Sequence, residues 1–486
     1  MTSIHFDLVI ANANVLDGSG SAPYLADIGI VKKRIHTIAP ANSLYGKQIL
    51  DASGLVVAPG FIDVHTHDDR EAIDQPAMLP KLTQGVTTVI AGNCGISLSP
   101  WKAQHAPPAP LSLIGAQSDY RYTQVADYVE ALRQAQPAVN VGFLIGHSTL
   151  RVNAVNDLSR AATVIEITAM QSLLAEGMQA GALGFSSGLF YQPSKAADNA
   201  EVIALAKISA AAGGVYTSHI RDEYSGVIEA LAEACDVGKE AQLPVILSHH
   251  KCAGPANWGR TTETLAYITQ RRSTQAIGLD AYPYTAGSTV LDPDYVDGII
   301  RIMVSFSAPH PEMQGRDLAD IAQEWSVDQK TAARRLHPAG AVYFQMHEDD
   351  VRRVLAYPHT MIGSDGLPHD SHPHPRLWGA FPRILGRYCR DEKLFTLAEA
   401  VRRMTSLSAD HFGLKQRGRI APQCWADLVI FDPATISDQA TFDQPKQAAS
   451  GIRWVVVNGA IALADGVPNI VRHGSVLHRQ TERFTN

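Results

Sequence analysis

The sequence contains no apolar run of the roughly 20 residues that a membrane-spanning helix requires. Its 41 lysine and arginine residues form no basic run, and the formal net charge is −7. A nucleic-acid-binding surface would need clustered basic residues on one face. We therefore expect no membrane span and no nucleic-acid partner.

Cysteine is scarce and irregularly spaced. The five cysteines, an odd number, stand at positions 94, 235, 252, 389 and 424. Disulfide frameworks use even numbers of cysteines at regular spacings. The first residues also lack the basic and then apolar pattern of a secretory signal. We expect a cytoplasmic protein with reduced thiols, in which a special cysteine is a ligand rather than a crosslink.

Both ends of the chain are rich in short strands separated by turn residues. With 486 residues, the chain is too long to fold around a single hydrophobic core. It is long enough for a large domain plus a smaller one. We expect these strands to form one small sheet domain, although two unrelated caps would give the same pattern. The expected strands are Phe6–Ile10, Ile28–Val31, Ile35–Ile38, Leu55–Val57, Ala426–Phe431 and Trp454–Asn458.

The middle of the chain alternates short apolar runs with helical patterns, which is typical of βαβ units. The pattern predicts an α/β fold with a closed parallel barrel, and an open doubly wound sheet is the alternative. Eight strands are predicted at Phe61–His65, Val86–Ala91, Val139–Gly146, Leu183–Ser187, Val215–His219, Val245–His249, Ile277–Tyr282 and Thr360–Asp365. Helices are predicted between them at Val125–Gln134, Ile165–Gln179, Glu201–Ala212, Val227–Ala241 and Thr261–Arg271.

A long interval separates the seventh and eighth strands. It contains two helical patterns, Arg316–Glu324 and Lys330–Leu336. An insertion after a barrel strand lies on the face where substrates bind, so residues 285–345 are a candidate lid. A subdomain without a role in the reaction is the alternative.

Chemically active side chains follow the predicted strands. Histidine, cysteine and aspartate occur at the ends of strands one, two, five, six and eight, namely His65, His67, Cys94, His219, His249 and Asp365. Each alone has an ordinary structural interpretation. In a barrel, however, the carboxyl ends of the strands meet at one face, where catalytic residues lie. These side chains are also the ligand types of zinc, so the sequence predicts a metal-dependent hydrolase.

Several longer motifs make the chain similar to a known family. Two of them are general, Pro59-Gly-Phe-Ile-Asp63-Val-His65-Thr-His67 and Gly418-Arg-Ile-Ala-Pro-Gln-Cys-Trp-Ala-Asp427. More specific are Gln84-Gly-Val-Thr-Thr-Val-Ile-Ala-Gly-Asn-Cys94, Gly146-His-Ser-Thr-Leu-Arg151, Ser248-His-His-Lys251, Asp280-Ala-Tyr282 and Gly363-Ser-Asp365-Gly-Leu-Pro-His-Asp370. With these motifs the chain resembles the amidohydrolase superfamily and, within it, the D-aminoacylases (N-acyl-D-amino-acid deacylases), over residues 6–475.

The resemblance implies a (β/α)8 TIM-type barrel at residues 59–414. It also implies a small β-sandwich domain formed by residues 1–58 and 415–486, and a mobile lid after strand seven. The activity implied is zinc-dependent hydrolysis of N-acyl-D-amino acids to a carboxylate and a free D-amino acid.

The resemblance further implies the metal ligands. Cys94, His219 and His249 would hold one tight Zn²⁺, and His65 and His67 would contribute to a second, weaker site. Many amidohydrolases bridge two metals with a carboxylated lysine from strand four, but residues 182–188 contain no lysine. Cys94 is expected to take the bridging role.

Roles in the reaction follow from the same resemblance. Asp365 is expected to act as the general base that later protonates the leaving amine. A purely metal-binding role for this aspartate is the alternative. Donors for the substrate α-carboxylate are expected at Lys251, Tyr282, Ser288 and Arg376, since a cation with a phenol or a guanidinium fork suits a carboxylate. An ordinary structural role, at the surface or behind the site, is the alternative for each of them.

The substrate side chain is predicted from the segment after Ser288. It contains Asp292 and Asp294 and no base before Arg301. We therefore expect neutral, hydrophobic D-residues. Alternatives are an N-acyl-D-glutamate or N-acyl-D-aspartate deacylase, and an amidohydrolase for cyclic amides or dipeptides. A non-catalytic scaffold is a further alternative, and it would be expected to lose the metal ligands that this chain keeps.

Overall fold

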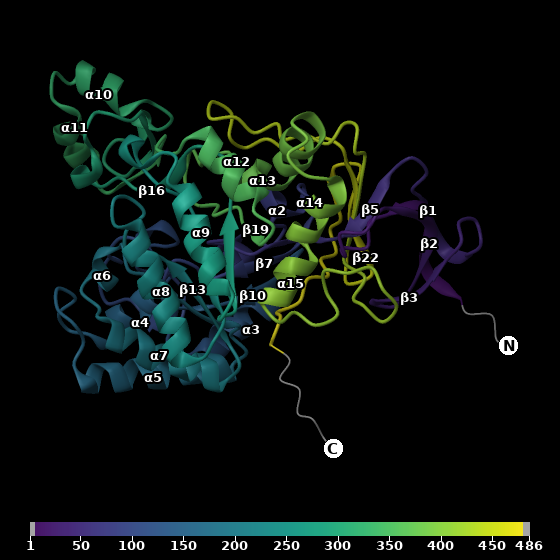
Figure 1. Ribbon diagram of the computed structural model, residues 1–486, viewed down its shortest axis with the longest axis horizontal. Helices are drawn as coiled ribbons and strands as arrows, with labels where there is room; N and C mark the ends of the chain where they lie inside the picture. The colour runs from purple at the N-terminus through teal and green to yellow at the C-terminus, as the bar shows by residue number, and fades with distance from the viewer. Residues whose placement is uncertain (1–4, 480–486) are drawn as a thin grey trace.

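Eight parallel strands stand at the centre of the computed structural model, which describes residues 5–479 (Figure 1). All eight predicted strands are present, and they are buried throughout, as expected for strands covered on both faces. They are β6 (Phe61–Asp63), β7 (Val86–Ala91), β10 (Asn140–Phe143) with β11 (Ile145–Gly146), β12 (Gly184–Gly188), β13 (Val215–His219), β14 (Val245–Leu247), β15 (Ile277–Ala281) and β19 (Thr360–Ile362).

The strands close into a barrel. The paired order runs β6–β7–β10 and then β11–β12–β13–β14–β15–β19. A parallel bridge between Thr66 and Gly366 joins the last strand to the first, and the amide of Asp365 donates to the carbonyl of His65 over 2.8 Å. The predicted closed barrel is confirmed. The single third strand predicted at Val139–Gly146 is wrong in detail, because it is interrupted at Leu144: β10 before this residue pairs with β7, and β11 after it pairs with β12.

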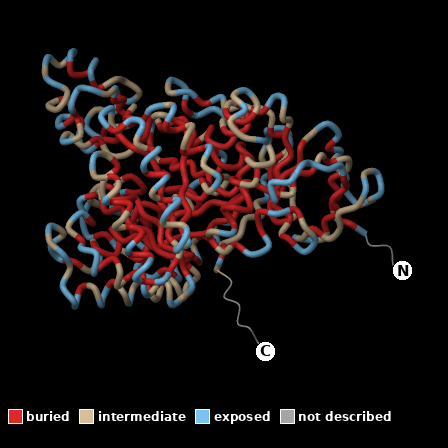
Figure 2. Tube along the Cα trace, viewed as in Figure 1, coloured by how far each residue is buried: buried red, intermediate tan, exposed pale blue. Residues whose placement is uncertain are grey.

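Helices surround the barrel (Figure 1), and buried residues concentrate at the centre of the molecule (Figure 2). In α8, for example, Val227, Leu231 and Ala234 are buried at helical spacing. The predicted helices are confirmed as α3 (Val125–Ala135), α5 (Val164–Gln179), α7 (Asn199–Ala211), α8 (Val227–Ala241) and α9 (Thr261–Arg272). Within residues 5–479, no helix combines the length and apolarity needed to cross a membrane.

Strands from both ends of the chain share one nine-stranded sheet. The link is β5 (Val56–Pro59) from the start, which pairs antiparallel with β20 (Leu428–Phe431) from the end. The expectation of one joint sheet is therefore confirmed. Its other strands are β1 (Phe6–Val15), β2 (Tyr24–Val31), β3 (Arg34–Ala39), β4 (Gly46–Asp51), β21 (Ile452–Val457), β22 (Ala460–Ala464) and β23 (Val467–Pro468). The sequence analysis did not predict β4, β22 and β23.

The insertion after β15 projects from the barrel (Figure 1). Both predicted helices are present, as α10 (Leu318–Glu324) and α11 (Gln329–Leu336). They pack on an antiparallel sheet that the sequence analysis did not predict, built from β16 (Gly287–Val290), β18 (Ala339–Tyr343) and β17 (Ile302–Ser307). The insertion has a small apolar core of its own, and β16 also borders the cavity at the barrel mouth.

Candidate active site

A glycine-flanked turn directs Cys94 into the barrel mouth. Gly92 and Gly95 on either side have φ angles of 80° and 75°, a region that disfavours side chains. A Cβ atom on Gly92 would also lie 2.1 Å from the carbonyl oxygen of Leu144. The Cys94 side chain is buried, and its sulfur faces the histidines that follow β6 and β14.

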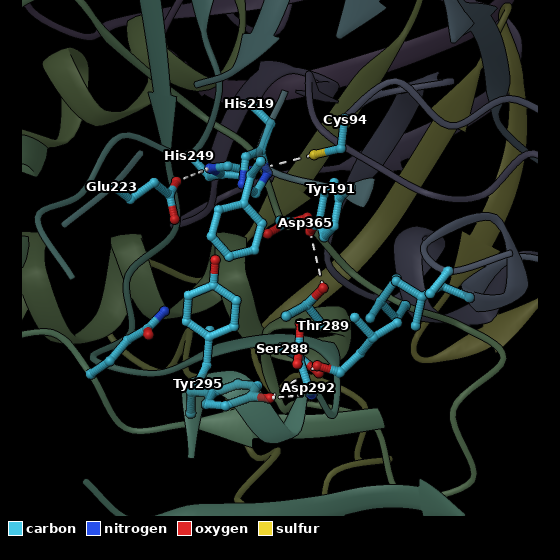
Figure 3. A pocket seen from close by; sticks show the side chains of 18 of the residues that line it. Cys94, Tyr191, His219, Glu223, His249, Ser288, Thr289, Asp292, Tyr295 and Asp365 are labelled. Atoms are coloured by element: carbon cyan, nitrogen blue, oxygen red, sulfur yellow. Dashed lines mark hydrogen bonds and ion pairs between the residues drawn. The ribbon is translucent and has the colours of Figure 1, made fainter. Parts of the chain in front are cut away.

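The predicted ligand residues converge at this point, and Figure 3 shows Cys94, His219, His249 and Asp365 among them. The Sγ atom of Cys94 lies 3.2 Å from Nε2 of His65 and 3.3 Å from Nε2 of His249. The ring of His219 lies 4.5 Å from that of His249, centre to centre. Nε2 of His67 approaches Oδ1 of Asp365 to 3.2 Å. One cluster therefore contains all six residues predicted from the strand ends.

The cluster fits a metal ion. Both ring nitrogens of His219 and Nδ1 of His67 are buried and have no hydrogen-bond partner within residues 5–479. Buried polar groups in native structures are almost always paired, so these nitrogens require a ligand. Donor atoms of His65, Cys94, His249 and Asp365 lie within 4.8 Å of one another. Imidazole, thiolate and carboxylate are the donor set of zinc.

The charged state of the cluster also suits a cation. Burial alone would raise the pKa of the Cys94 thiol, but the imidazoles of His65 and His249 bring it well below its ordinary value. Burial likewise opposes ionisation of Asp365, whose pKa is held well below its usual range by Arg376 and the neighbouring histidines. A thiolate and a carboxylate are therefore available at neutral pH.

The residues expected to donate hydrogen bonds to the substrate α-carboxylate lie beside the cluster of predicted metal ligands. The ring of Tyr282 has Arg376 at 4.5 Å and Lys251 at 5.8 Å from its centre. Each cation already contacts a protein carboxylate: Arg376 Nη1 lies 2.9 Å from Asp365, and Lys251 Nζ lies 2.6 Å from Glu223. Ser288 has a buried hydroxyl without a partner in the described residues.

Sequence reasoning missed several residues of the same cavity, which measures about 390 Å³. Glu223 follows β13 in the Ser-His-Ile-Arg-Asp-Glu segment and contacts both His249 and Lys251. The aromatic rings of Phe190, Tyr191 and Tyr295 line the cavity, as does the exposed Lys195. Loop residues of this kind carry no periodic signal, and only the fold brings them together.

Comparison with known proteins shows where the chain belongs. The sequence profile of the amidohydrolase family matches residues 48–276 and 260–463. A D-aminoacylase of Alcaligenes xylosoxydans xylosoxydans is 49% identical over 455 residues, which cover 94% of each chain. The chain belongs to the amidohydrolase family, in its D-aminoacylase group. An N-acyl-D-glutamate deacylase of the same organism is 46% identical to this amidohydrolase over 97% of this chain and 96% of the other.

Solved structures agree with this assignment. A structure of D-aminoacylase described for its binuclear metal centre matches this amidohydrolase with a TM-score of 0.95 and 47% identity. It is aligned over 98% of this chain and all of the other. The N-acyl-D-glutamate deacylase of Bordetella bronchiseptica, complexed with zinc and a phosphonate inhibitor, matches with a TM-score of 0.93 and 45% identity, at the same coverage. The (β/α)8 barrel with its β-sandwich domain and the family resemblance are confirmed.

Proposed function

We propose that this amidohydrolase uses zinc to hydrolyse N-acyl-D-amino acids to a carboxylate and a free D-amino acid. The observation that supports this most is that one cavity contains two kinds of site. A cluster of predicted metal ligands that includes the Cys94 thiolate lies beside the phenol of Tyr282. That phenol is flanked by two cations. The first suits cleavage of an amide, and the second suits the α-carboxylate of an amino acid.

Cys94, His219 and His249 would hold one tight zinc ion, and His65 and His67 would contribute to a weaker second site. The sulfur of Cys94 lies between His65 and His249, so one thiolate can face both sites. β12 contains no lysine, which favours cysteine over a carboxylated lysine in the bridging role. When bound, zinc polarises the amide carbonyl and lowers the pKa of water towards about 7.

Asp365 would act as the general base and then as the general acid. It accepts a proton from the attacking water and returns it to the departing amine nitrogen. Its Oδ1 atom lies 3.2 Å from His67 and 3.4 Å from His65, while Oδ2 lies 2.9 Å from Arg376. These contacts hold the carboxylate at the metal cluster and keep it ionised before the reaction.

Lys251, Tyr282, Ser288 and Arg376 would bind the substrate α-carboxylate. An ammonium has three donors and a guanidinium has five, so their contacts with Glu223 and Asp365 leave donors for a substrate. The unpartnered hydroxyl of Ser288 adds a further donor beside Arg376, which already donates to the Ser288 carbonyl over 3.0 Å. This cluster orients the amino acid so that its amide faces Asp365.

The walls of the cavity favour a neutral, apolar side chain. Phe190 and Tyr295 pack with ring centres 4.9 Å apart, and Tyr295 also stacks on Tyr224 at 5.9 Å. Arg301, the first base after Ser288, binds Asp317 at 2.9 Å and does not line the cavity. Asp292 also lines the cavity and would repel an anionic side chain, whereas Asp294 is paired with Lys330 at 3.1 Å.

Lys195 supports a second candidate, an N-acyl-D-glutamate or N-acyl-D-aspartate deacylase. Its exposed side chain lines the cavity, and sequence reasoning overlooked it because it precedes the segment after Ser288. A cation at this rim can receive a substrate carboxylate.

We further propose that the barrel spans residues 59–414, that residues 1–58 and 415–486 form the second domain, and that residues 285–345 act as a lid. Of the second domain, residues 1–4 and 480–486 lie outside the described residues. The hydroxyl of Tyr191 bonds to Thr289 over 3.0 Å, and that of Tyr224 donates to Gln345 over 2.9 Å. These bonds link the insertion to loops of the barrel.

A hydrolysis screen tests these assignments. The zinc-loaded protein should release the amino acid from N-acetyl-D-leucine, D-methionine and D-phenylalanine faster than from N-acetyl-D-glutamate or D-aspartate. Lys195→Met should leave the apolar substrates unaffected. If the acidic substrates are preferred and Lys195→Met abolishes that preference, the second candidate replaces the first. Hydrolysis of L-substrates alone, or of cyclic amides alone, would refute both.

A further inference from the structure

The carboxylate of Glu223 links the predicted metal ligands to the residues proposed to bind the substrate α-carboxylate. We propose that Glu223 is a positioning residue that fixes the ring of His249 for zinc and the ammonium of Lys251 for the substrate. This inference rests on the proposed function, since it assumes that His249 binds zinc and Lys251 binds the α-carboxylate.

Both contacts of Glu223 involve a single oxygen atom. Oε1 of Glu223 lies 2.6 Å from Nζ of Lys251 and 3.1 Å from Nδ1 of His249. Nζ of Lys251 and Nδ1 of His249 are themselves 2.8 Å apart. The three side chains are buried, so water does not replace any one of these partners at low cost.

The chemistry of the imidazole determines which contact is a hydrogen bond. Nε2 of His249 faces Cys94 at 3.3 Å, so Nε2 is the atom that would bind zinc, and the ring proton would then reside on Nδ1. Nδ1–H is then a donor, and so is the ammonium of Lys251. Two donors 2.8 Å apart repel each other unless both face a common acceptor. Glu223 is that acceptor.

The loop after β13 holds the carboxylate in this position. The carbonyl of Glu223 accepts the amide of Ala253 over 2.8 Å, and Asp222 accepts the amides of Tyr224 and Gly226. Because the loop is fixed on both sides of Glu223, its carboxylate is oriented before zinc or substrate binds. Partners that orient a metal-bound histidine in this way typically contribute 10–100-fold to metal affinity.

Glu223→Gln is the direct test, because it keeps the shape and removes the charge. Zinc affinity, measured on the metal-free protein by competition with a chelator, should fall about 10-fold. The KM for N-acetyl-D-leucine should rise at least about 10-fold, because a neutral amide oxygen holds an ammonium less firmly than a carboxylate does. The kcat at saturating zinc should change less than KM. Glu223→Ala should lower zinc affinity further.

Glu233→Gln is the matched control. Its carboxylate binds Arg221, from the same loop, at 2.7 Å and is remote from the cluster contacts above. In a Lys251→Met background, Glu223→Gln should still weaken zinc binding while adding less than twofold to KM. This difference separates positioning from general damage to the fold, which would lower thermal stability in every background.

Zinc affinity and KM equal to those of Glu233→Gln would overturn the inference, and so would a lower KM in Glu223→Gln. The two proposals also fail in different ways. If no N-acyl-D-amino acid is hydrolysed, the proposed function fails, but the zinc competition still decides whether Glu223 orients His249.

Discussion

Three residues of the candidate site have backbone angles that side chains rarely adopt. The φ angles are 54° at Cys94, 36° at His249 and 50° at Asp365. Each such residue costs on the order of 1–3 kcal/mol, and residues of this kind concentrate at functional sites. The turns at the ends of β7, β14 and β19 aim the three side chains at one another, so the strain and the geometry have the same origin.

A substitution at Asp365 can distinguish the proposed general-base role of this residue from a role in metal binding. Asp365→Asn keeps the shape and loses the proton acceptor, so kcat should fall by about 10²–10⁴-fold. Zinc content, measured by elemental analysis, should be unchanged. Asp349→Asn, at an exposed position on α12 (Glu348–Ala356), is the control and should keep full activity. An active Asp365→Asn variant would show that another residue is the base.

The site was largely predictable at the level of single residues but not of pairs. His65, Cys94 and Asp365 could be predicted because parallel strands of a barrel end at one face. Glu223 could not, since its partners His249 and Lys251 lie on a different strand end. For the same reason, sequence alone did not show that Lys251 and Arg376 each contact a carboxylate of the protein.

Among the elements, most barrel strands were predictable because their apolar runs are continuous and bounded by turn residues, although β12 (Gly184–Gly188) lacks such a run. The split of the third strand was not, since it depends on the change of pairing partner from β7 to β12 at Leu144. The sheet of the insertion was missed as well. Its strand β16 begins Gly287-Ser-Thr, which has no alternation of apolar residues.

A buried lysine joins two strand ends beneath the site. Lys81, on α2 (Leu79–Leu82), donates to Asp63 over 2.9 Å and to Ser364 over 2.8 Å. Lys81→Met would leave Asp63 as an unpaired buried charge, so the free energy of unfolding should fall by about 3–5 kcal/mol. The free energy of unfolding is measured by urea denaturation, and Lys102→Met, at an exposed position, is the control. A loss under about 1 kcal/mol would contradict this.

A buried ion pair between two helices predicts a pH dependence of stability. Glu201 on α7 binds Arg151 and His147 of α4 (His147–Ala154) at 2.5 and 2.8 Å. Although burial opposes ionisation, these partners lower the pKa of Glu201 from 4.5 to about 2. Its folded-state pKa is depressed, so the stabilisation, roughly 3 kcal/mol, is complete above pH ~5 and is lost as pH falls towards 2.

Glu201→Gln tests this dependence. The stability difference between wild type and variant, measured by denaturant unfolding, should be largest near pH 7 and shrink between pH 5 and pH 2–3. A difference that stays constant across this range would mean that the charge of Glu201 does not stabilise the fold.

On the scale of the whole molecule, the predicted metal ligands come from strand ends that are far apart in sequence. Zinc that binds the folded state and not the unfolded chain stabilises the fold by about 2.7 kcal/mol at 100 times its Kd. Thermal unfolding should therefore show a higher Tm for the zinc-loaded protein, by about 3 °C or more. The same addition should leave the Tm of Cys94→Ala unchanged, and an equal rise there would remove Cys94 from the tight site.

A zinc titration of the metal-free protein with N-acetyl-D-leucine as substrate tests the central claim most directly. We predict no hydrolysis without metal, a rate that rises until about one zinc is bound per chain, and no comparable rate with N-acetyl-L-leucine. Full activity of the metal-free protein, or hydrolysis of the L-isomer alone, would contradict zinc-dependent deacylation of N-acyl-D-amino acids.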